Sequence, residues 1–98
     1  MQYDKFLSIT KELEPPKTLS GINLAIWYAV KDKWDMAHNI VQDINTKTAY
    51  WIHAYLHRVE GDIGNANYWY NRARKDHSTE SLESELNEII KSVFVHKC

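Results

Sequence analysis

Residues 51–62 decide the fold, and they read Trp51-Ile52-His53-Ala54-Tyr55-Leu56-His57-Arg58-Val59-Glu60-Gly61-Asp62. Ile52, Leu56 and Val59 recur at helical spacing and form one apolar stripe. Gly61 suits the left-handed conformation that ends a helix, and the Asp62 carboxylate suits the cap of the next one. We therefore predict a helix over 47–60, a tight turn, and a second helix over 62–75.

Helical periodicity continues on both sides of this stretch. We predict four further helices, over 2–13, 19–31, 33–44 and 80–95. Pro15 and Pro16 end the first of them, and Thr46 can cap the helix over 47–60. No segment alternates as a strand would, so the predicted fold class is all-α. The short loops predict an array of antiparallel helical hairpins.

The composition limits the classes of protein that the chain can belong to. Its 98 residues favour a single helical domain over 1–98, and 44% hydrophobic residues exclude a disordered chain. The formal charge of −1 gives no electrostatic reason to expect nucleic acid or an anionic membrane as a partner. Cys98 is the single cysteine, which excludes an intrachain disulfide. With no secretory signal and no membrane-spanning stretch, we expect a cytoplasmic protein.

A pattern of small and large residues recurs in the middle of the chain. Ala54, Gly61, Ala66, Tyr70 and Ala73 resemble the positions of a tetratricopeptide unit, and a weaker copy precedes them. The matching positions of that copy are Ala25, Tyr28, Trp34, Ala37 and Val41, with Asp32 where the turn glycine belongs. The resemblance covers about residues 19–75. It implies a tetratricopeptide-like centre, which the first and last helices would flank as caps.

The run from Trp51 to Asp62, continued by Asn65-Ala66 and Tyr68-Trp69-Tyr70, has a second resemblance. It looks like a stretch found in a group of short bacterial proteins. This resemblance implies a bacterial cytoplasmic origin and carries no activity with it.

Aromatic and arginine side chains form the first candidate site. Trp51, Tyr55 and Arg58 share one face of the helix over 47–60, and the tetratricopeptide resemblance places the corresponding face on a concave surface. Four residues of the next helix add to this surface: Asn65, Tyr68, Trp69 and Arg72. Such residues carry much of the binding energy at interfaces. The leading hypothesis is a non-enzymatic module that binds a protein segment or a small ligand. The alternative for each ring is burial under the first and last helices.

The second candidate site is a metal site on the same helix. His53, His57 and Glu60 cluster on one face, and imidazoles at i and i+4 can share one divalent ion, with the carboxylate as a third ligand. An acid–base role would use the same groups, but no nucleophile or phosphate-binding loop accompanies them. The structural alternative is a pair of histidines hydrogen-bonded within a helix seam. We therefore expect no catalytic residue and no cofactor.

The last predicted helix bears on self-association. Glu83, Glu85, Glu88 and Lys91 surround its apolar stripe, which is typical of a solvated face. A stripe with this spacing could also pair two copies, so a homodimer stays open.

Overall fold

The computed structural model describes residues 1–94 and forms them into six α-helices. They are α1 (Tyr3–Ile9), α2 (Gly21–Val30), α3 (Trp34–Val41), α4 (Lys47–Val59), α5 (Ile63–Ala73) and α6 (Leu82–Val93). No strand occurs among these residues, so the all-α prediction is confirmed. Each predicted helix is present, most of them shorter by one to three residues at an end. The exception is α1, which ends at Ile9, four residues before its predicted end, so Pro15 and Pro16 do not end it. The last residue of the final predicted helix, Val95, and Cys98 lie outside the described residues. None of the helices in 1–94 is long and apolar enough to cross a membrane.

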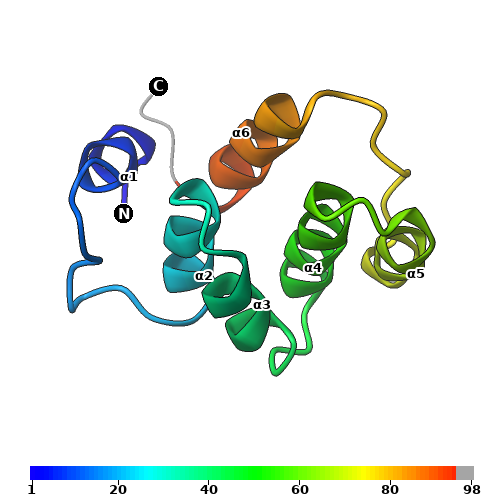
Figure 1. Cartoon of the computed structure of the whole chain (residues 1–98). Coiled ribbons are helices and arrows are strands. Elements are labelled where there is room, and N and C mark those ends of the chain that lie inside the picture. The colour runs from blue at the N-terminus through cyan, green and yellow to red at the C-terminus, as the bar shows by residue number, and fades with distance from the viewer. Residues whose placement is uncertain (95–98) are drawn as a thin grey trace.

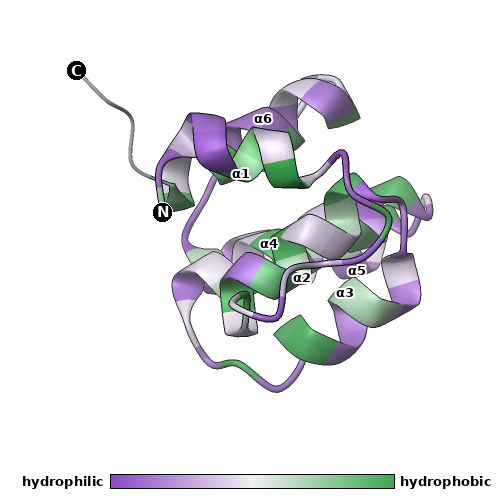
Figure 2. Ribbon diagram, turned by 90° about the vertical axis from the view of Figure 1, so that its left-hand side faces the viewer, coloured by the Kyte–Doolittle hydropathy of each residue, from purple (hydrophilic) through white to green (hydrophobic). Residues whose placement is uncertain are grey.

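Consecutive helices make the closest pairs, α2 with α3 and α4 with α5. Figure 1 shows α1 and α5 on opposite sides of the molecule, with α2, α3 and α4 between them. Turned by 90°, α1 and α6 lie above the other four helices (Figure 2). Helix α6 packs against α2 and α4, over the middle of the array. The last helix thus covers α2 and α4, and its predicted role as a cap of the array stays a prediction.

Small residues and large rings together build the core. Ala37, Ala54 and Ala66 are fully buried in α3, α4 and α5, and they let neighbouring helices approach closely. The ring of Phe6 in α1 stacks on Phe94 just after α6, with centroids 4.0 Å apart. This ring pair joins α1 to the end of α6.

The turns after α2 and α4 share one geometry, 29 residues apart. Asp32 and Gly61 both adopt a left-handed conformation, with φ of 62° and 85°. The next amide in each turn bonds back to the carbonyl five residues earlier, Lys33 to Tyr28 and Asp62 to His57, both at 2.9 Å. Aspartate tolerates this conformation better than most residues, so Asp32 can replace the expected glycine. The two central hairpins therefore have the same turn geometry. The resemblance to a tetratricopeptide unit stays a prediction.

The side chain of Thr46 caps α4, as predicted. Its hydroxyl accepts a hydrogen bond from the amide of Ala49 at 3.1 Å. Ser20 stands at the same position of α2 but makes no capping bond with its side chain. We expect Thr46→Ala to lower the free energy of unfolding by about 1 kcal/mol. Ser20→Ala is the matched control and should leave it nearly unchanged in the same urea titration. Equal losses in the two variants would contradict the capping role of Thr46.

Candidate functional site

Three histidines from two helices meet at the centre of the candidate site, and we call them the histidine cluster. His38 comes from α3, and His53 and His57 come from adjacent turns of α4. One ring nitrogen of each lies within 4.8 Å of the other two. The packing of α3 against α4 thus adds a third imidazole to the pair that the sequence predicted. The sequence analysis did not include His38 in the predicted site. A signal was present, because His38 lies four residues after Trp34 and therefore shares the side of α3 that faces α4.

Two tryptophans hold the histidine cluster from either side. The Trp34 ring stacks on His38, with centroids 4.6 Å apart, and its indole Nε1 donates to the carbonyl of Leu56 at 2.6 Å. The Trp69 ring stacks on His53 with centroids 3.9 Å apart and planes 12° apart. Because each indole covers a flat imidazole face, the ring edges with their nitrogens are left to face one another or other polar groups.

The surroundings of His53 and His38 favour the neutral imidazole. Burial, together with the neighbouring His38 and His57, lowers the pKa of His53 to about 4. Burial also lowers the pKa of His38, and the proximity of His57 adds to this, while Glu60 and Asp35 oppose it. A neutral imidazole keeps a lone pair on one nitrogen, which is the form that binds a metal ion.

The hydrogen bonds of His53 and His57 differ sharply. His53 is only 4% exposed, and its Nδ1 is buried without a hydrogen-bond partner within residues 1–94. His57 places its Nδ1 2.6 Å from Oε1 of Glu60. Glu60 therefore contacts His57 alone, from outside the cluster. The sequence spacing had suggested instead that Glu60 would share one ion with both His53 and His57. An unpartnered buried nitrogen costs free energy that a bound ion would recover.

Three residues of the predicted aromatic–arginine surface lie beneath α6, which corrects their expected exposure. Trp51 and Tyr55 are buried in the core. Arg58 donates to the carboxylate of Glu85 at 2.6 Å, and Trp51 donates to the same carboxylate at 3.1 Å. Tyr70 of α5 also donates its hydroxyl to Glu85, which is 1% exposed. The predicted solvated position of Glu85 is therefore wrong, and its carboxylate joins α4, α5 and α6.

Three other predicted surface residues, Tyr68, Trp69 and Arg72, remain at least partly exposed near the histidine cluster. Together with Tyr50, which the prediction did not include, they form what we call the aromatic–arginine patch. The Arg72 guanidinium lies over all three rings, 4.5 Å from the centroid of Tyr50, 5.2 Å from that of Trp69 and 6.0 Å from that of Tyr68. Asn65 stands apart, because both its backbone and its side-chain amides bond to Asp62 at the start of α5. The predicted set of seven residues is thus divided among three places.

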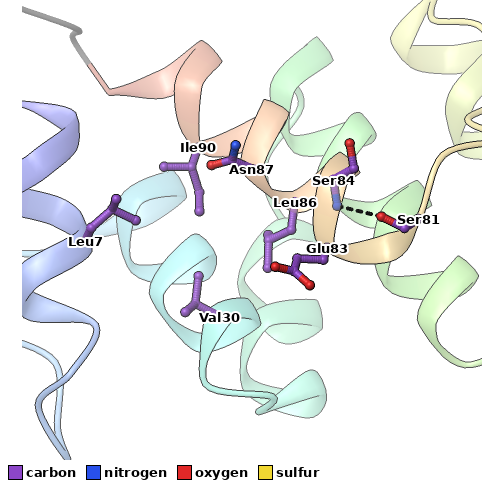
Figure 3. A pocket seen from close by; sticks show the side chains of 8 residues that line it. All are labelled: Leu7, Val30, Ser81, Glu83, Ser84, Leu86, Asn87 and Ile90. Atoms are coloured by element: carbon purple, nitrogen blue, oxygen red, sulfur yellow. Dashed lines mark hydrogen bonds between the residues drawn. The ribbon is translucent and has the colours of Figure 1, made fainter.

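A separate open groove of about 530 Å³ lies between α1, α2 and α6. Leu7, Val30, Leu86 and Ile90 give it an apolar floor, and Ser81, Glu83, Ser84 and Asn87 give it a polar side (Figure 3). Glu83 is the single titratable group in this lining. The groove therefore lacks the concentration of ligating groups that distinguishes the histidine cluster.

No protein-family model, curated protein or solved structure matches this chain. Arguments about its function therefore rest on the geometry of its own residues.

Proposed function

We propose that the protein binds one divalent transition-metal ion at the histidine cluster. The observation that carries this proposal is the buried, unpartnered nitrogen of His53 within a group of three imidazoles. Three histidines are a sufficient protein ligand set for zinc, with a fourth position left for water or another ligand. The ligand nitrogens would move inward, because around a tetrahedral ion they stand about 3.3 Å apart.

The position of the histidine cluster also supports this proposal. His38 is half-buried and adjoins the buried pair on α4, so it is the most exposed of the three imidazoles. Since the two helices contribute different ligands, a bound ion would cross-link α3 to α4. Binding to the folded state alone stabilises a protein, by about 2.7 kcal/mol when the free ion is at 100 times its dissociation constant.

Zinc titration of metal-free protein tests this function. We expect one Zn²⁺ per chain by calorimetry and a rise in the melting temperature. His38→Gln, His53→Gln and His57→Gln should each weaken binding by more than roughly tenfold, since even outer-shell changes cost that much. His77→Gln, at an exposed histidine hydrogen-bonded to Asn71, is the control and should bind normally. The proposal fails if the native chain binds no zinc, or if the control weakens binding as much as the cluster variants do.

The aromatic–arginine patch supports a second candidate function, the binding of a protein segment or a small ligand. Tyr68 is 54% exposed. Among residues 1–94, Arg72 donates one hydrogen bond, to the hydroxyl of Tyr50, which leaves other donors of its guanidinium free. His38→Gln separates the two functions, because His38 has no ring contact with the patch. It should weaken zinc binding by more than roughly tenfold and leave recognition through the patch unchanged.

A further inference from the structure

Glu60 is placed so that it can control which ring nitrogen of His57 keeps a lone pair free for a ligand. It follows the last residue of α4, one turn after His57, and its side chain is 40% exposed while that of His57 is 8% exposed. A carboxylate only accepts hydrogen bonds, so at 2.6 Å the hydrogen of this contact belongs to Nδ1 of His57. The lone pair of the neutral ring then lies on Nε2.

We infer that Glu60 is the positioning residue of the metal site, an inference that rests on the proposed function. Glu60 holds His57 in one tautomer and one orientation, with Nε2 free for the ion. Histidine ligands in metal sites commonly donate their second nitrogen to a carboxylate in this way, which fixes the ring and strengthens the ligand.

The competing arrangement would make Glu60 a ligand itself. A second group of possible ligands joins His57, Glu60 and Asp62 near the surface. The two carboxylate oxygens of Asp62, however, accept from the backbone and the side chain of Asn65 at 3.2 and 3.3 Å and cap α5. The groups that would complete this second site are therefore already engaged.

The two arrangements select different ions. Three neutral imidazoles favour Zn²⁺, Ni²⁺ and Cu²⁺, whereas a site with two carboxylates suits Mn²⁺, Mg²⁺ or Ca²⁺. The inference therefore extends to the class of ion: the protein takes up ions that prefer nitrogen ligands and discriminates against ions that prefer oxygen.

Three variants test the role of Glu60 by calorimetry with Zn²⁺ and with Mn²⁺. Glu60→Ala removes the acceptor and should weaken zinc binding by roughly 10–100-fold. Glu60→Gln keeps a carbonyl oxygen that can accept from Nδ1–H, so it should restore part of this loss. Asp62→Asn is the matched control, because asparagine also caps helices well, and its zinc affinity should equal that of the native chain. Binding of Mn²⁺ should be weaker than binding of Zn²⁺ throughout.

The nitrogen chemical shifts of His57 in ion-free protein supply a readout independent of affinity. We expect the Nδ1–H tautomer in the native chain and in Glu60→Gln, and a mixture of tautomers in Glu60→Ala. The inference is overturned if Glu60→Ala binds zinc normally, if Asp62→Asn weakens binding as Glu60→Ala does, or if the tautomer is the same in all variants. A native chain that binds no zinc but shows the Nδ1–H tautomer would refute the proposed function and leave the hold of Glu60 on His57 established.

Discussion

Replacing Glu85 with alanine should lower the free energy of unfolding by about 3–5 kcal/mol, which is typical when one partner of a buried ion pair is removed. The Glu85 carboxylate accepts hydrogen bonds from Trp51, Arg58 and Tyr70. Without it, a guanidinium whose side chain is 16% exposed loses its counter-ion, and two ring donors lose their acceptor. Since domains are stable by only about 5–15 kcal/mol, a loss of this size removes a large part of the native stability.

Urea unfolding followed by circular dichroism measures this loss. Glu83→Ala is the matched control, because Glu83 is an exposed glutamate on the same helix, and its loss should be within about 0.5 kcal/mol. Glu85→Gln retains an acceptor but removes the charge opposite Arg58, so it should fall between the control and Glu85→Ala. A loss below about 1 kcal/mol for Glu85→Ala would show that these bonds do not stabilise the packing of α6.

Local sequence signals were sufficient to predict which segments form helices and which residues cap α4 and α5. Thr46 and Asp62 accept the amide bonds expected at the starts of α4 and α5. Gly61 adopts the expected left-handed conformation. These features depend on contacts within a few residues of the chain, which periodicity and side-chain chemistry describe well.

The placement of α6 was harder to predict, because it depends on contacts between residues far apart in the sequence. The leading hypothesis placed Trp51 and Arg58 on a binding surface, and burial was the alternative for the ring. In the structure α6 lies over both residues and supplies Glu85 as their acceptor. The sequence did contain a signal for this burial. Glu85 stands three residues after Leu82 and four before Ile89, on the apolar stripe of its helix. A charge at such a position indicates a buried partner, and an arginine on another helix is the natural one.

The histidine cluster was predicted only in part, because it too depends on contacts between residues far apart in the sequence. The spacing of His53 and His57 within one helix was sufficient to pair them. The addition of His38 required the packing of α3 on α4, which no local pattern specifies. His38 nevertheless follows Trp34 by four residues, so the two share one side of α3. A prediction that grouped the polar residues on the core-facing sides of different helices into one site would have included His38.

The metal-free protein should lose stability in mildly acidic solution because of His53. In the unfolded chain this imidazole has a pKa near 6.5, and burial with two histidine neighbours lowers the pKa to about 4 in the fold. The unfolded state therefore binds more protons between these two pH values, so folding is favoured above pH 6.5 and progressively weakened as the pH falls toward 4. A shift of this size corresponds to about 3 kcal/mol in total. The lowered pKa of His38 acts in the same direction.

Urea unfolding in the presence of a chelator, from pH 7.5 to pH 4, measures this dependence. His53→Phe keeps a ring against Trp69 and removes the titrating group, so its stability should vary with pH by about 3 kcal/mol less than that of the native chain. His77→Gln, at an exposed position, should follow the native curve. The comparison isolates His53, because the carboxylates and the other histidines titrate in every variant. Parallel curves for His53→Phe and the native chain would mean that His53 accepts its proton as readily in the fold as in the unfolded chain. The buried nitrogen would then be reached by water, and the main support for a metal site at the histidine cluster would be lost.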